Sequence, residues 1–192
     1  MNKQFLAIVI LVIFYSIYYI KQLLLKRKGI KVNQIKYNRS KLTVVMGVSN
    51  LLLAIVEINS IYMNTVNKNG NIFIFGIILS ALGDIIFYLS VKEMGDNWRA
   101  GVNPNSKTTL VTKGIYQYSR NPAFLGFYLV YIGVMLMFYN KYLFIFTVLT
   151  ITMLHFQITL IEEPYLKETF KFEYIIYQKQ VNRYLGHKVH NW

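Results

Sequence analysis

Five apolar segments, each long enough to cross a membrane, constrain what this chain can fold into more than any other feature. They cover residues Gln4–Leu25, Leu42–Met63, Ile72–Val91, Pro122–Tyr139 and Tyr142–Ile161. A helix of about 18–22 residues spans the hydrocarbon core of a bilayer, which is about 30 Å thick. Because a backbone in lipid must satisfy its own hydrogen bonds, such segments fold as helices. The sequence therefore predicts an all-α, polytopic helical membrane protein with about five transmembrane helices.

The composition of the chain agrees with this fold class and narrows its chemistry. Hydrophobic residues make up 55% of the 192 residues, which excludes a disordered chain. There is no cysteine, so disulfides, thiolate catalysis and thiolate metal sites are excluded. The three histidines, at 155, 187 and 190, lack metal-ligand spacing, and no metal site is expected. The net charge is +13, and the basic residues behind it flank the apolar segments. No nucleic-acid-binding motif accompanies them, so no nucleic acid partner is expected.

The basic residues are distributed in a way that predicts the orientation of the chain. The segments after the first, third and fifth apolar segments are basic, whereas the other two loops offer only Lys68 and Lys141. Lysine and arginine are enriched in cytoplasmic loops. We therefore expect the N-terminus outside the cell membrane and the C-terminus in the cytoplasm. The first apolar segment is too long for a signal peptide and has no cleavage pattern, so we expect a retained span.

The chain is expected to form one integral membrane domain, residues 1–192. Within it, residues 1–93 supply the first three spans, and residues 94–192 supply a helical hairpin and a tail. Apolar residues recur in the tail at spacings of three or four, at Leu166, Phe170, Tyr174, Tyr177, Val181 and Tyr184. This pattern predicts a C-terminal amphipathic helix that lies on the membrane or on the functional site.

Two polar segments interrupt the apolar pattern, and the hairpin brings them to the same side of the membrane. One is Leu110–Gly126 (LVTKGIYQYSRNPAFLG) and the other is Glu162-Glu163-Pro164. An antiparallel hairpin returns the chain to the side it left, so the two segments should face each other. Taken alone, the carboxylates also fit a solvated helix end, and Arg120 with its aromatic neighbours fits an interfacial belt. Together the two segments predict a cytoplasmic functional site.

Polar side chains inside the spans are further candidates for function. Glu57 and Asp84 lie in the second and third spans, and His155 and Gln157 lie in the fifth. An ionisable group buried in a span is costly, and it is a functional hypothesis by default.

These motifs resemble the signatures of the isoprenylcysteine carboxyl methyltransferase and phospholipid methyltransferase group of integral membrane enzymes. The signature Leu-Val-Thr-x-Gly-x-Tyr-x-x-x-Arg-His-Pro-x-Tyr-x-Gly is matched by Leu110–Tyr116 and Arg120–Gly126. The second signature is a glutamate pair followed by a leucine and Phe-Gly-x-x-Tyr. It is matched by Glu162-Glu163, Leu166, Phe170 and Tyr174. Upstream, Gly95–Val102 is similar to the group's Gly-x-x-Trp-x-x-Gly segment. The resemblance covers roughly residues 94–185.

The resemblance implies a methyltransferase that uses S-adenosylmethionine and methylates a lipophilic acceptor in the lipid bilayer. The cofactor would bind at the cytoplasmic end of the fourth and fifth spans. The matching cofactor-binding positions are Thr108, Thr109, Leu110, Val111, Gly114, Tyr116, Asn121, Pro122, Phe124, Glu162 and Glu163. Arg120, Asn121 and Arg183 are the candidate catalytic residues, with the arginines as anchors for an anionic acceptor or for the cofactor carboxylate.

Three positions depart from the pattern of that group. Asn121 replaces a histidine, Phe124 replaces a tyrosine, and Gln157 lies near where the prenylcysteine enzymes have an arginine. Asparagine forms hydrogen bonds but does not act as a base. The sequence therefore leaves three candidates for the methyl acceptor: a lipid amine, a lipid hydroxyl and another small lipophilic molecule. A non-catalytic membrane subunit on the same fold and an NADPH-dependent sterol-type reductase are the alternatives.

Overall fold

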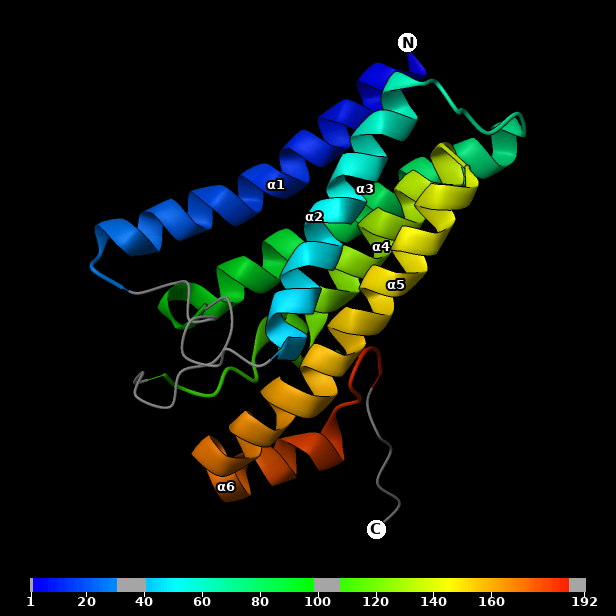
Figure 1. The fold of residues 1–192 in the computed structure, drawn as a ribbon. Helices are drawn as coiled ribbons and strands as arrows, with labels where there is room; N and C mark the ends of the chain where they lie inside the picture. Colours follow the sequence, from blue (N-terminus) through cyan, green and yellow to red (C-terminus); the bar gives the residue numbers. More distant parts are fainter. Residues whose placement is uncertain (1, 31–40, 99–107, 187–192) are drawn as a thin grey trace.

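The computed structural model describes residues 2–30, 41–98 and 108–186, and within these ranges it is built from helices (Figure 1). The long helices are α1 (Lys3–Arg27), α2 (Lys41–Tyr62), α3 (Gly70–Met94), α4 (Pro122–Met137), α5 (Lys141–Gln157) and α6 (Glu163–Gln180). Two short 3-10 helices, η1 (Gly95–Asn97) and η2 (Gly114–Gln117), lie between α3 and α4. A π-helix, η3 (Ile158–Glu162), joins α5 to α6. The predicted all-α architecture is confirmed.

Four helices in the described ranges are long and apolar enough to cross a membrane, and they contain α1, α2, α3 and α5. The fourth predicted span, α4, has 16 residues, about 24 Å at 1.5 Å per residue. The prediction placed its end at Tyr139, but the chain already leaves the helix at Phe138. Asn140 then caps α5 by accepting a hydrogen bond from the backbone N–H of Leu143 at 3.0 Å. The protein is an integral membrane protein.

Helices α3 and α4 form a closely packed antiparallel pair that supports the first polar segment. Gly76 and Gly83 on α3 face Gly133 and Gly126 on α4. A Cβ atom at Gly83 would lie 2.8 Å from the carbonyl oxygen of Gly126, and one at Gly76 would lie 2.7 Å from that of Gly133. Small residues of this kind let membrane helices approach backbone to backbone. The start of α4 at Pro122 is thereby fixed against α3.

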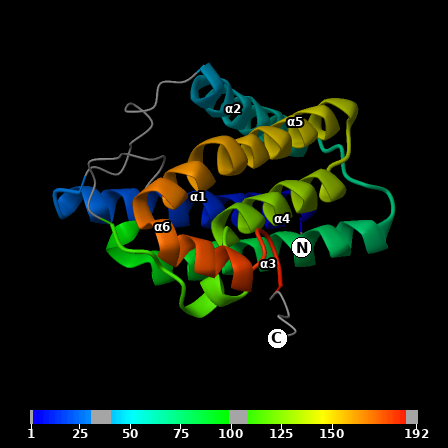
Figure 2. The ribbon, with the colours of Figure 1, turned by 90° about the horizontal axis from the view of Figure 1, so that it is seen from below.

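The other helices form a second layer and leave a space between the layers. Seen from below, α2 and α5 lie on one side of the bundle, and α3 and α4 lie on the other (Figure 2). The hydroxyl of Thr150 on α5 donates to the carbonyl of Ser49 on α2 at 3.2 Å. On the other side, the rings of Phe14 on α1 and Phe87 on α3 are 5.3 Å apart. Each contact holds together the helices on its own side of the bundle, and a cavity lies between the two sides.

The tail differs from a single straight amphipathic helix. Helix α6 bends at Lys171, where φ is +44°, so that it forms a first leg (163–170) and a second leg (172–180). It ends at Gln180, earlier than the periodicity up to Tyr184 predicts. Residues 181–186, which we call the strap, run instead along the first polar segment. The N–H of Arg120 donates to the carbonyl of Asn182 at 3.1 Å. Val181 still packs inward, which explains why the apolar spacing continues past the helix.

Parts of two predictions lie outside the described residues. They are Arg99–Val102 of the Gly95–Val102 segment and the histidines at 187 and 190.

Candidate functional site

A cavity of about 450 Å³ lies between the two layers. Small-molecule sites in proteins have volumes of about 300–1,000 Å³, so the cavity is large enough for a cofactor. Aromatic rings form a large part of its wall. The rings come from α1, α4 and the connection between α3 and α4, and they belong to Phe14, Tyr15, Tyr18, Tyr19, Trp98, Tyr116, Phe124, Phe127 and Tyr131.

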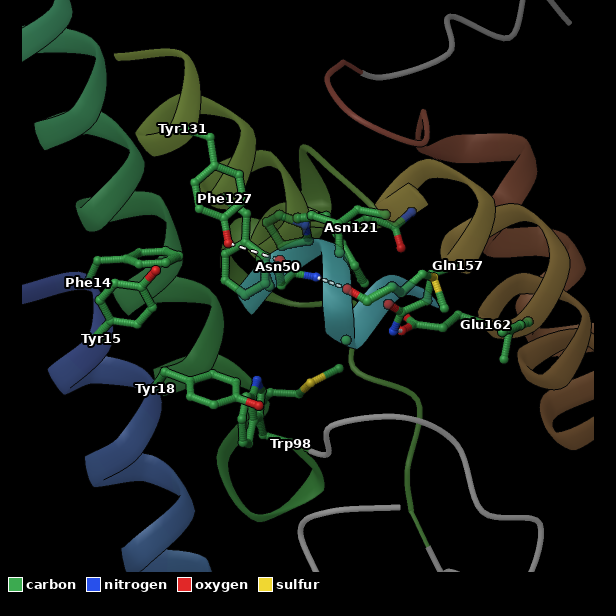
Figure 3. Close-up of a pocket in the computed structure, with 18 of the residues that line it drawn as sticks. Phe14, Tyr15, Tyr18, Asn50, Trp98, Asn121, Phe127, Tyr131, Gln157 and Glu162 are labelled. Carbon is green, nitrogen blue, oxygen red and sulfur yellow. Dashed lines mark hydrogen bonds between the residues drawn. The ribbon is translucent and has the colours of Figure 1, made fainter. Parts of the chain in front are cut away.

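Polar side chains gather at one end of the cavity, as Figure 3 shows for Asn121, Gln157 and Glu162. Arg120 lines the same end. Arg120, Asn121 and Glu162 come from the two polar segments that the hairpin was predicted to bring together, and Gln157 comes from the end of α5. Phe14 and Tyr15 lie at the opposite end (Figure 3). The cavity therefore has a polar end and an aromatic end.

The π-helix η3 sets the geometry of this polar end. Gln157 and Glu162 are five residues apart, and in a regular α-helix their side chains would point about 140° away from each other. The wider turn of η3 brings them together, and the Gln157 amide donates to a Glu162 carboxylate oxygen at 2.8 Å. π-helical turns occur frequently at functional sites. No local feature of the sequence marked this turn in advance.

The adjacent Glu163 lies in a different polar group, outside the residues that line the cavity. Its buried carboxylate accepts two hydrogen bonds from Arg183, both at 2.9 Å, and it lies 3.1 Å from Nη1 of Arg120. Two guanidinium groups thus share one carboxylate. The hydrogen bonds with Glu163 raise the pKa of Arg183, so its charge is held at all ordinary pH values. Nε of Arg120 is buried without a hydrogen-bond partner among the described residues.

Asn121 connects the cavity to the strap. It lines the cavity and is 7% exposed, and its side-chain amide donates to the carbonyl of Arg183 at 3.2 Å. Its backbone N–H donates to the hydroxyl of Ser119 at 3.1 Å. The side-chain amide nitrogen of Asn121 is therefore directed at the strap. Within the described part of the chain, Oδ1 is the acceptor that stays available to a ligand.

Tyr116 is the buried anchor of η2 beside the cavity. It is 4% exposed, and its hydroxyl donates to the carbonyl of Ser90 at 3.5 Å. Burial raises the pKa of Tyr116, so it is a neutral phenol. The hydroxyl of Tyr177 donates to the Tyr116 carbonyl at 2.6 Å, and α6 is thereby held against η2.

The structure divides the predicted site residues into two sets. Those that line the cavity are Tyr116, Arg120, Asn121, Pro122, Phe124 and Glu162. Those beside it, as far as the described residues show, are Thr108, Thr109, Leu110, Val111, Gly114, Glu163 and Arg183.

The second set has structural contacts of its own. Thr109 accepts a hydrogen bond from Asn97 at 2.9 Å, and Leu110 and Val111 pack with the cluster around Tyr116. Gly114 has φ +57°, and a Cβ atom there would lie 2.6 Å from Cδ of Glu93. This glycine therefore allows the loop to approach α3 closely. Much of the first polar segment supports the site rather than lining it.

Sequence reasoning missed the part of the site that α1 and α2 contribute. These helices supply Phe14, Tyr15, Tyr18, Tyr19, Met46, Gly47, Asn50, Leu51 and Ala54. Asn50 accepts a hydrogen bond from the Tyr131 hydroxyl at 3.2 Å. A polar residue within the second span was the one available signal, since the other residues look like ordinary lipid-facing side chains.

The sequence pattern of the family described as phospholipid methyltransferase matches residues 71–173, more than half of the 192-residue chain. The match begins at the start of α3 and ends in α6, so it includes α4, η3 and the polar end of the cavity. No curated protein gives a significant match.

Proposed function

This chain belongs to the phospholipid methyltransferase family, and we propose that it transfers a methyl group from S-adenosylmethionine to a lipophilic acceptor in the bilayer. The predicted relationship to this family of integral membrane methyltransferases is confirmed. One observation carries the finer proposal: η3 places Glu162 and Gln157 at the polar end of an aromatic cavity. We further propose a single domain with its N-terminus outside and the site on the cytoplasmic side.

The residues at the polar end suit the charges of S-adenosylmethionine. When bound, this cofactor supplies an activated methyl group on a sulfonium cation. Glu162 offers a carboxylate to a cationic or hydroxyl-bearing part of it, and Asn121 offers an acceptor oxygen. The faces of Tyr116 and Phe124 can stabilise a positive charge by cation–π contact. Arg120 is the cation in the lining that could meet a carboxylate.

The acceptor that fits the remaining lining best is a lipid amine. Methylation of an amine leaves a cationic product, which aromatic faces bind well. Asn50 and Tyr131 add hydrogen-bonding groups at the aromatic end. The cavity volume of about 450 Å³ is within the size range of small-molecule sites, so in this proposal the lipid headgroup enters it without the acyl chains. These chains would stay in the bilayer.

The protein contributes mainly orientation and exclusion of water to such a reaction. A sulfonium methyl group needs an aligned nucleophile, and alignment is worth several kcal/mol of the barrier. Asn121 does not take up a proton, so a lipid ammonium group would release its proton to water before the amine nitrogen attacks the methyl group and S-adenosylhomocysteine leaves. The alternative of a non-catalytic subunit predicts a folded protein that neither binds nor transfers.

Methyl transfer from radiolabelled S-adenosylmethionine into a lipid extract tests this proposal. Purified protein in proteoliposomes should label the lipid fraction. Glu162→Gln should lower the rate about 10- to 100-fold, the worth of a hydrogen bond to a charged group. Glu168→Gln, an exposed position on α6, is the matched control and should keep the wild-type rate. A folded wild-type protein that labels no lipid would support the subunit alternative.

A further inference from the structure

The second leg of α6 has two apolar faces, and the packing of the protein explains only one of them. The inner face carries Tyr174 and Tyr177, which are buried against the cluster around Tyr116. The outer face carries Phe172 and Ile176, each about 160° around the helix axis from Tyr174. Phe172 is 73% exposed and Ile176 is 40% exposed. An amphipathic helix that packs on a protein core has a polar outer face, so this outer face requires another partner.

The strap shows at which level of the membrane this leg lies. The hydroxyl of Tyr184 forms hydrogen bonds with Nδ1 of His155 and with the hydroxyl of Tyr128. His155 is in the last turn of α5, and Tyr128 is in the second turn of α4. The strap is therefore inserted between the ends of two apolar helices of the bundle. The second leg leads directly into the strap, so it is held where the hydrocarbon core meets the headgroups.

Other exposed apolar side chains lie on the strap and on the segment that the strap contacts. Leu185 follows Tyr184 in the strap and is 70% exposed. The N–H of Gly186 donates to the carbonyl of Tyr118 at 2.8 Å, and the Tyr118 ring is also exposed. We call Tyr118, Phe172, Ile176 and Leu185 the interfacial patch.

The charges beside the patch match a membrane surface. Lys171, at the bend of α6, and Lys179, on the second leg, are exposed. Lysine side chains at a membrane interface extend their ammonium groups to lipid phosphates while their carbon stems cover apolar surface. Figure 1 shows the second leg, drawn in red, turning back beside the first leg toward the bundle. Tyr118, Phe172, Ile176 and Leu185 are all outside the set of residues that line the cavity.

We propose that the interfacial patch inserts into the headgroup layer of the bilayer, so that the lipid surface holds the second leg and the strap over the site. The strap carries Arg183 and the carbonyl that receives the Asn121 amide. The bilayer would thus complete the cover of the polar end. This inference does not depend on the methyl-transfer proposal, because it concerns where the tail lies.

Site-directed spin labelling tests the proposal directly, because the chain has no cysteine and each introduced one is unique. Single nitroxide labels would be attached to Phe172→Cys, Ile176→Cys and Leu185→Cys. Lys113→Cys and Glu168→Cys, at exposed polar positions, are the reference sites. The labelled proteins are reconstituted into vesicles of phosphatidylcholine and phosphatidylglycerol. Collision of each label with oxygen, which partitions into lipid, is compared with collision with a water-soluble nickel chelate.

We expect the ratio of oxygen to nickel collisions to be several-fold higher at the three patch positions than at the two reference positions. Equal nickel accessibility at all five positions would place the patch in water and overturn the proposal. Low accessibility to both reagents at the patch would mean that a protein surface, such as a second copy of the chain, covers it, and this would also overturn the proposal. Three independent labels protect the test from the misfolding of any one variant.

Discussion

Glu162 and Glu163 are neighbours in the sequence, but they belong to two polar regions with different properties. Glu162 lies in an open region with Asn121 and Gln157, at the end of the cavity. Glu163 lies in a closed region with Arg120 and Arg183, where its carboxylate meets two guanidinium groups. In the closed region the carboxylate is fully engaged by the protein itself. In the open region a carboxylate and an amide oxygen face a cavity. The difference indicates that the closed region holds the strap and that the open region receives a ligand.

The largest effect is expected from removing the negative charge of Glu163 from the closed region. Glu163→Gln leaves two guanidinium groups, one of them buried, without their carboxylate. Breaking a buried ion pair by removing one partner costs about 3–5 kcal/mol. We expect a loss of about 3 kcal/mol in the free energy of unfolding, measured by denaturant titration in one detergent, because Arg183 keeps some solvent contact.

The control for this measurement is Glu168→Gln, an exposed carboxylate on the same helix. It should change the free energy of unfolding by less than about 0.5 kcal/mol. If Glu163→Gln behaved like this control, the closed region would have no structural role.

A smaller effect is expected from disturbing the close packing of α3 against α4, which positions both the open and the closed region. Gly126→Val places new atoms against α3, where a Cβ atom would lie 2.9 Å from the Gly83 carbonyl oxygen. Overpacking of this kind costs about 1–3 kcal/mol. The start of α4 would shift, so cofactor binding and stability should fall together. Gly70→Ala, outside the cavity lining and at a position where a Cβ atom meets nothing within 4 Å, should leave binding unchanged and stability nearly unchanged. If Gly126→Val lost cofactor binding without losing stability, the α3–α4 packing would not be the common basis of both properties.

The smallest effect on stability is expected at the residue that joins the two regions. Asn121→Ala removes the hydrogen bond to the Arg183 carbonyl, which is worth about 1 kcal/mol. It also removes the acceptor oxygen on the cavity side, so affinity for S-adenosylmethionine should fall several-fold. Thermal unfolding and binding would be measured on the same preparation. Unchanged affinity would mean that Asn121 only holds the strap and does not contact the cofactor.

The sequence predicted the helices and the juxtaposition of the two polar segments because both follow from strong physical constraints. Apolar segments of about 20 residues have few folds available in a membrane. The hairpin of α4 and α5 brings Tyr116, Asn121 and Glu162 to one cavity. Their assignment to a cofactor remains a prediction.

The sequence did not predict the contributions of α1 and α2, for a physical reason. A membrane helix is apolar on the face that meets lipid and on the face that lines an aromatic cavity, so periodicity does not separate Phe14 from Phe5. The first is 3% exposed and the second is 57% exposed. The π-turn was equally hidden, because Ile158–Glu162 has no residue that an α-helix disfavours strongly. This turn decides which of the two glutamates enters the cavity.

In the proposed function the open region binds the methyl donor, and calorimetric titration with S-adenosylmethionine and S-adenosylhomocysteine tests this claim most directly. Wild type, Glu162→Gln and Glu168→Gln would be compared in the same detergent, with the free energy of unfolding measured alongside. We expect saturable binding by the wild type and by Glu168→Gln, and an affinity about 10- to 100-fold lower for Glu162→Gln at unchanged stability. Equal affinity of Glu162→Gln and wild type, or no binding by a folded wild type, would contradict the claim.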